Sequence, residues 1–107
     1  MFVRIITYQM TDEAINEIET IGKEILAKTG PILRDMKGWI KTELIIDKKN
    51  KVFKTIAYWN SRDDAKANKE YDPKLPGFLY MQIGRYAQHL DDSNLIIEHY
   101  DLLETIE

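Results

Sequence analysis

Short runs of alternating or clustered apolar residues mark four parts of the chain and predict four strands. These runs cover residues 2–10, 39–46, 52–59 and 95–103. Only the polar stretch 47–51 separates the second run from the third, which predicts a hairpin. No run has a fully polar face, since in the first one Val3 and Ile5 alternate with Phe2 and Ile6. Strands that are apolar on both sides are covered on both sides in the folded protein.

A helical pattern follows the first strand. Thr11 is a good N-cap, with acidic residues directly after it. Gly30 and Pro31 are stop signals and predict the end of this helix. Residues 32–36 can make a further helical turn before Gly38. Gly22 falls in the middle of the apolar face, where glycine costs about 1 kcal/mol relative to alanine. Two explanations are open: a close approach of the helix to the sheet, or room for a ligand. The apolar face consists of Ala14, Ile15, Ile18, Ile21, Ile25 and Leu26.

The second half of the chain predicts an interrupted helical region. Ser61 and Asp64 form a shortened capping box that starts a helix through about Tyr71. Two prolines in residues 72–77 interrupt the helical pattern. A further helical piece then has Gln82, Arg85 and His89 along one edge of its apolar face. That face consists of Phe78, Leu79, Ile83, Tyr86, Ala87 and Leu90.

The order of these elements predicts one α+β domain over residues 1–107. A β-α-β-β-α-β order is that of the ferredoxin-like fold, a four-stranded antiparallel sheet with helices on one face. The predicted helices cover one face of the sheet only, whereas the strands are apolar on both. We therefore expect a second copy of the chain to cover the other face, in a homodimer with the sheets face to face.

Composition excludes several kinds of protein. The chain is 44% hydrophobic and 31% charged, with a net charge of −3, and its lysines and arginines are scattered. A nucleic-acid binder would present a basic face. Cysteine is absent, which excludes disulfides, thiolate metal sites and a cysteine nucleophile. The N-terminal sequence does not resemble a signal peptide, and no apolar run approaches the length of about 20 residues that spans a membrane. The expectation is a cytoplasmic protein with no membrane and no nucleic-acid partner.

Two short segments carry a resemblance to a known family. Residues 37–40 read Lys-Gly-Trp-Ile, and residues 57–65 read Ala-Tyr-Trp-Asn-Ser-Arg-Asp-Asp-Ala. Together with the element order, they resemble the antibiotic biosynthesis monooxygenase family of the dimeric α/β-barrel superfamily. The family usually has glutamate where this chain has Asn60. The resemblance implies a homodimer whose sheets pack into a barrel, with a pocket between sheet and helices in each subunit.

Family members include cofactor-independent oxygenases of polycyclic phenols and quinols, and haem-degrading enzymes. The haem-degrading branch depends on an asparagine at the end of the first strand, a tryptophan in the second helix and a nearby histidine, of which His89 is a possible counterpart. This chain has Thr7, Tyr8 and Gln9 at the first place and no tryptophan after Trp59. Haem binding is therefore only a third hypothesis.

The candidate catalytic residue is His89, because histidine transfers protons near neutral pH. Tyr86 or Arg85 would steady the resulting anion. The alternative for His89 is a structural contact with the carbonyls at a helix end. The candidate substrate-binding residues are Tyr8, Trp59, Phe78 and Gln82. For the large aromatic ones, the alternative is a place in the core.

Two other residues stand out on the predicted strands. Arg4 lies among apolar residues and requires an anionic partner, for which Glu98 or Glu43 is the expected choice, or else it binds an anionic ligand. His99 is expected to be structural or part of the dimer interface. His89 and His99 are too far apart in sequence to form a recognisable metal motif.

The leading hypothesis is a homodimeric, monooxygenase-like protein that binds a small aromatic or quinone-like molecule and uses no metal or other cofactor. The alternative is a dimeric module that binds such a molecule without catalysis. The sequence leaves open whether the protein is an enzyme.

Overall fold

The computed structural model describes residues 1–70 and 95–107. The elements are β1 (Phe2–Gln9), α1 (Asp12–Arg34), β2 (Trp39–Asp47), β3 (Val52–Trp59), α2 (Arg62–Ala67) and β4 (Ile96–Asp101). This is the predicted β-α-β-β-α-β order. The further helical piece predicted over residues 78–90 lies outside the described residues.

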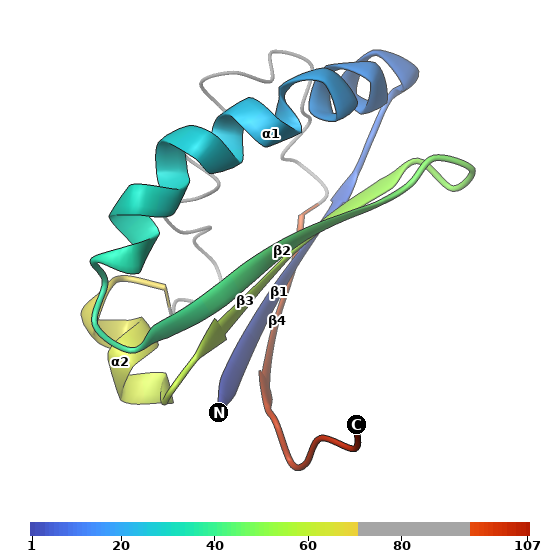
Figure 1. The fold of residues 1–107 in the computed structure, drawn as a ribbon. Coiled ribbons are helices and arrows are strands. Elements are labelled where there is room, and N and C mark those ends of the chain that lie inside the picture. Colours follow the sequence, from blue (N-terminus) through green and yellow to red (C-terminus); the bar gives the residue numbers. More distant parts are fainter. Residues whose placement is uncertain (71–94) are drawn as a thin grey trace.

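The four strands form one antiparallel sheet in the order β2-β3-β1-β4 (Figure 1). The first strand is therefore central, and β2 and β4 are the edges. The predicted ferredoxin-like fold is confirmed.

Helix α1 starts where the sequence predicts but ends later. The Thr11 hydroxyl accepts a hydrogen bond from the Ala14 amide at 3.2 Å, which is the expected N-cap. The predicted end at Gly30 and Pro31 is wrong, because the helix continues to Arg34. Proline removes one backbone hydrogen bond from the last turns. Leu33 is buried beyond it, and this packing offsets the loss.

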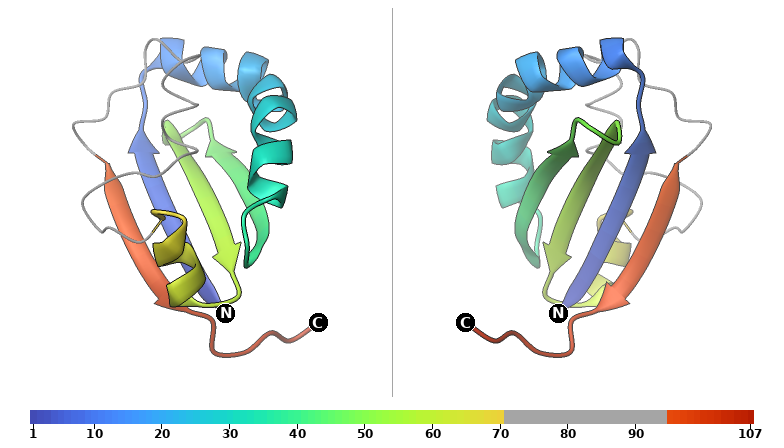
Figure 2. Two further views of the ribbon diagram at one scale, coloured as in Figure 1. Left: turned by 90° about the vertical axis from the view of Figure 1, so that its left-hand side faces the viewer. Right: turned by 90° about the vertical axis from the view of Figure 1, so that its right-hand side faces the viewer.

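Both described helices lie on the same side of the sheet, and α1 arches across it (Figure 2). We call this side the helix face and the opposite side, which no described helix covers, the open face. Because side chains alternate along a strand, Phe2, Ile6 and Tyr8 of β1 lie on the helix face, where all three are buried. Two apolar clusters form there. One joins Ile6, Tyr8 and Phe53 to α1, and the other joins Phe2, Trp59 and Ala65 of α2.

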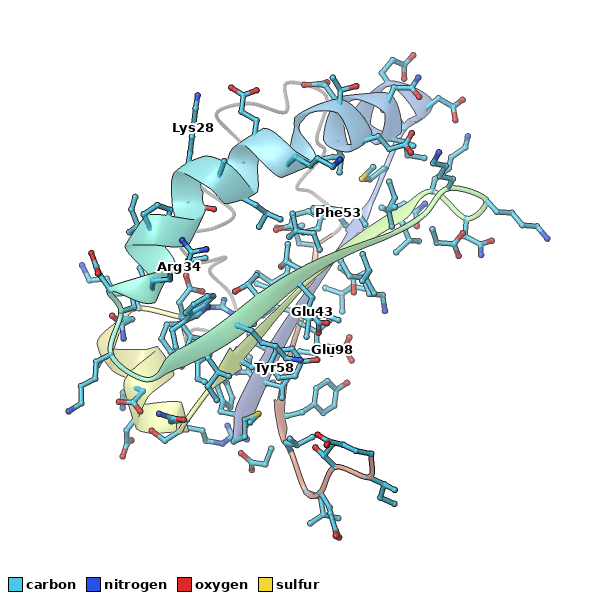
Figure 3. The ribbon with its side chains drawn as sticks, viewed as in Figure 1. Lys28, Arg34, Glu43, Phe53, Tyr58 and Glu98 are labelled. Carbon is cyan, nitrogen blue, oxygen red and sulfur yellow. The ribbon has the colours of Figure 1, made fainter. Side chains whose placement is uncertain are left out.

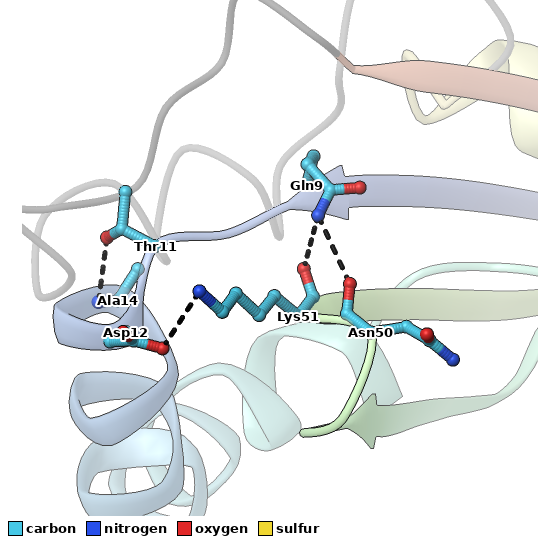
Figure 4. A network of polar contacts seen from close by, with 6 residues as sticks. All are labelled: Gln9, Thr11, Asp12, Ala14, Asn50 and Lys51. Carbon is cyan, nitrogen blue, oxygen red and sulfur yellow. Dashed lines mark hydrogen bonds and ion pairs between the residues drawn. The ribbon is translucent and has the colours of Figure 1, made fainter.

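The turn of the β2–β3 hairpin is attached to the start of α1 (Figure 4). The Gln9 side chain donates to the carbonyls of Asn50 and Lys51, at 3.2 and 3.1 Å. The Lys51 ammonium lies 3.3 Å from the Asp12 carboxylate in the first turn of α1. These contacts fix the N-terminal half of α1 over the hairpin end of the sheet.

Neither α1 nor α2 combines the length and the apolar character that a membrane crossing requires.

Candidate functional site

The strand register arranges the helix face in rows that run across the sheet. One row is polar at its centre, because Arg4 pairs with Ala57 on one side and with His99 on the other, and Ala57 in turn pairs with Thr42. We call these four residues the polar row. It separates the apolar cluster under α1 from the one under α2.

A crevice of about 200 Å³ opens between α1 and the hairpin. Among the described residues that line it, the two charged ones, Glu19 and Lys23, are solvent-exposed, so the described part of its inner wall is apolar. The lining is Ile18, Glu19, Gly22, Lys23 and Leu26 of α1, with Leu44, Ile45, Ile46 and Phe53 of the hairpin. We call this hollow the α1 crevice. Pockets for drug-sized ligands usually exceed about 300 Å³, so the crevice fits one ring or one end of such a molecule.

Gly22 decides between the two explanations offered for it. Outside its own turn of helix, a Cβ built on Gly22 would have no atom of the described residues within 4 Å. Close approach of the helix to the sheet therefore does not explain this glycine. The explanation that remains is the open space of the α1 crevice, at the cost in helix propensity that glycine carries.

Tyr8 and Trp59 both lie on the helix face and are almost completely buried. Tyr8 packs on Phe53, with ring centroids 5.1 Å apart, and so lies behind the wall of the α1 crevice. Trp59 pairs with Phe2 at the other end of the sheet. Six residues of strand separate the two levels, which is about 20 Å. One small aromatic molecule therefore cannot touch both side chains.

The predicted catalytic residues His89, Tyr86 and Arg85 lie outside the described residues, as do Phe78 and Gln82. Their roles stay predictions from the sequence.

Arg4 is buried, with 1% of its surface exposed, and its ion-pair partner is Glu70, at 3.1 Å. The expectation of Glu98 or Glu43 is wrong. The register pairs Glu98 with Ile5 and Glu43 with Ile56, so both glutamates lie on the open face. The alternation of side chains along the strands could have excluded Glu98 and Glu43 as partners of Arg4, whereas nothing in the sequence identifies Glu70.

His99 also lies on the helix face, since it pairs with Arg4. Its ring meets the Phe2 ring edge-on, with centroids 5.3 Å apart. His99 therefore does not lie on the open face, where the dimer interface is expected. Of its two expected roles, the structural one fits this position.

The open face combines an apolar centre with charges of both signs. Lys41 Nζ lies 4.6 Å from the centre of the Tyr58 ring. Hydrogen bonding to the Glu43 carboxylate raises the pKa of Tyr58, and Glu98 raises the pKa of Tyr100 in the same way. Figure 3 shows Glu43, Tyr58 and Glu98 on this side and Phe53 on the side of α1. The apolar residues of the face are Val3, Ile5, Ile45, Val52, Ile56 and Ile96.

A second hollow, of about 470 Å³, lies at the other end of the sheet, where β1 begins and β4 ends. Two of its charged side chains pair with each other, because Arg62 donates to both carboxylate oxygens of Asp101, at 3.0 and 3.2 Å. The Arg62 guanidinium lowers the pKa of Asp101 below its usual range. We do not assign a ligand to this hollow. In the part of the chain that the structure describes, no three histidine, aspartate or glutamate side chains gather as a metal site would require.

No protein-family model and no curated protein matches the chain. Solved structures do match. A Streptomyces coelicolor monooxygenase in complex with nanaomycin D has a TM-score of 0.66 at 13% identity, over 99% of this chain and 90% of that one. SnoaB, a cofactor-independent oxygenase from Streptomyces nogalater, gives 0.62 at 9% identity, over 98% and 95%. An antibiotic biosynthesis monooxygenase gives 0.61 at 18% identity, over 97% and 100%.

This chain therefore has the fold of the antibiotic biosynthesis monooxygenase structures, as the sequence resemblance predicted. A similar structure from Nitrosomonas europaea belongs to a protein of unknown function, so the fold alone does not assign an activity.

Proposed function

We propose that this protein is a homodimer that binds a small, flat aromatic or quinone-like molecule between its sheet and helices and oxidises it with molecular oxygen. The observation that carries the proposal is the open space at Gly22, on the helix face of a fold that this chain shares with a cofactor-independent oxygenase. The apolar lining of the α1 crevice suits a flat ring.

The proposed chemistry needs neither a metal nor a flavin, because the substrate itself supplies electrons as a phenolate or carbanion. The protein then removes a proton and stabilises the anion in an apolar pocket. The sequence assigns the proton transfer to His89, with Tyr86 or Arg85 beside the anion.

The proposed dimer joins two open faces. Ile45, Ile96 and Tyr100 are 48%, 56% and 47% exposed in the single chain, and a second sheet would cover them. The face carries Lys41 and Lys54 as well as Glu43 and Glu98. Since a two-fold axis presents the same surface from both sides, such a mixed pattern can pair opposite charges across the interface.

The dimer is tested with Ile5→Lys, which adds a charge to the centre of the open face. We expect wild type to sediment as a dimer at micromolar concentration and this variant to sediment as a folded monomer. Ile32→Lys is the control, because Ile32 is an exposed residue of α1; it should leave the dimer intact. A wild-type monomer would refute this part of the proposal.

The ligand site is tested with two glycines of the same helix. Gly22→Ala should stabilise α1 by about 1 kcal/mol and weaken binding of an anthrone or hydroquinone, because the new methyl group enters the α1 crevice. Gly30→Ala is the matched control, since the atoms nearest to its Cβ would belong to the flexible Arg34 side chain, at 3.5 Å. Equal affinities of the two variants would exclude the crevice as the ligand site.

The non-catalytic alternative is favoured by one feature: among the residues that the structure describes, those lining the α1 crevice include no histidine, tyrosine or hydroxyl side chain. Oxygen uptake separates the two functions. Turnover of an anthrone by wild type but not by His89→Ala supports the oxygenase, whereas binding without oxygen uptake supports the module.

A further inference from the structure

A permanent positive charge lies near the centre of the helix face. Arg4 belongs to the central strand, and apolar clusters lie on both sides of its row. Burying a charge costs several kcal/mol unless a partner compensates it. Apolar residues in place of a buried ion pair often leave a protein equally stable or more stable. The Arg4 guanidinium therefore requires an anionic partner for as long as it is buried.

The carboxylate that pairs with Arg4 follows a short helix. Glu70 follows α2, which has only six residues. It is placed by a Schellman turn, in which the Glu70 amide donates to the Ala65 carbonyl at 2.8 Å and the Lys69 amide donates to the Lys66 carbonyl at 3.1 Å. Lys69 adopts a left-handed φ of 61°, a conformation that costs a non-glycine residue about 1 kcal/mol. The turn that follows such a short helix can rearrange at lower cost than a strand, whereas a glutamate on a neighbouring strand is fixed by the backbone ladder.

The surroundings of Arg4 are more open than Arg4 itself. Its two neighbours in the polar row, Ala57 and His99, are both partly exposed. Ala57 also has the smallest side chain of the row. An anion that enters between sheet and helices would reach Arg4 along this row.

We infer that Arg4 is the anion-recognition residue of the ligand site and that Glu70 is an internal carboxylate which the ligand displaces. The ligand class that fits is an aromatic carboxylate: its ring lies against the apolar helix face and its carboxylate takes the place of Glu70, in the planar geometry that arginine recognises best. The inference rests on the proposed function insofar as it assumes a flat ligand between sheet and helices.

The test uses two probes of the same shape, 9,10-anthraquinone-2-carboxylate and its neutral carboxamide, titrated calorimetrically at pH 7.5. Wild type should bind the carboxylate about tenfold more tightly than the carboxamide. Glu70→Gln should strengthen carboxylate binding about fivefold to tenfold further, because the competing charge is gone, and leave carboxamide binding unchanged. Arg4→Met should abolish the preference for the carboxylate. Arg62→Met, which breaks the exposed pair with Asp101, is the matched control and should preserve it.

The outcomes separate this inference from the proposed function. Equal binding of both probes to wild type, or carboxylate binding unaffected by Glu70→Gln, overturns the role of Arg4 while aromatic binding stands. Binding of neither probe overturns the proposed function, and this inference with it. If Arg4→Met does not fold, the Arg4→Met/Glu70→Met double variant provides the protein without the buried charges, and it must show no preference.

Discussion

The backbone of Gly38 lies directly against the side chain of Asp64. A Cβ on Gly38 would come within 3.0 Å of the Asp64 side chain, closer than real Cβ atoms approach their neighbours. Asp64 belongs to the N-terminal cap of α2, since its amide donates to the Ser61 hydroxyl at 3.1 Å. Gly38, which precedes β2, thus leaves the space in which the N-terminal cap of α2 packs. Gly38 and Asp64 belong to the two segments that carry the family resemblance.

Gly38→Ala should therefore destabilise the protein strongly. Gly38 has a φ of 85°, which alanine adopts only with strain, and the added methyl group would push Asp64 out of the cap. We expect a loss of about 3 kcal/mol in the free energy of unfolding, measured by urea denaturation. An unfolding free energy equal to that of wild type would show that α2 does not depend on this contact.

Lys69→Gly should stabilise the protein by about 0.5–1 kcal/mol, because glycine adopts the left-handed conformation at no steric cost. The midpoint of thermal unfolding reports the change. Ala67→Gly is the control within α2 and should lower the midpoint, since glycine is a poor residue inside a helix. A decrease for Lys69→Gly would mean that its side chain outweighs the backbone strain.

Tyr58 and Tyr100 should titrate above the ordinary tyrosine pKa of about 10, because each phenol donates to a carboxylate, from Glu43 and Glu98. A folded-state pKa above the unfolded value contributes stability below about pH 10, which is lost as the pH rises through the raised pKa. Glu43→Gln and Glu98→Gln should each shift the alkaline absorbance change of one tyrosine to lower pH. Glu104→Gln, in the exposed C-terminal residues, should shift none.

The Arg4–Glu70 pair should behave as a buried ion pair in a double-mutant cycle. Glu70→Ala should cost about 3 kcal/mol, because it leaves the guanidinium buried without this carboxylate, whereas Arg4→Met/Glu70→Met should be closer to wild type than either single variant. Denaturant unfolding of the four proteins measures the coupling. Additive losses would mean that the two charges do not stabilise one another.

The sequence by itself determined the strands, their faces and the starts of both helices. Side-chain alternation placed Trp59 and Tyr58 on opposite faces, and the hydroxyls of Thr11 and Ser61 identified both N-caps. These features depend on neighbours within a few residues, so local physical chemistry suffices to predict them.

Only the tertiary structure decided which distant groups meet. Arg4 pairs with a carboxylate 66 positions away, Gly22 borders open space instead of a strand, and α1 passes Pro31 because Leu33 finds a place in the core. In each case the outcome depends on packing or charge compensation between segments that are far apart in the sequence. The periodic pattern of apolar residues does not show which distant segments come into contact. A strand pattern fixes the side of the sheet on which a residue lies, but the path of the whole chain fixes what stands opposite it.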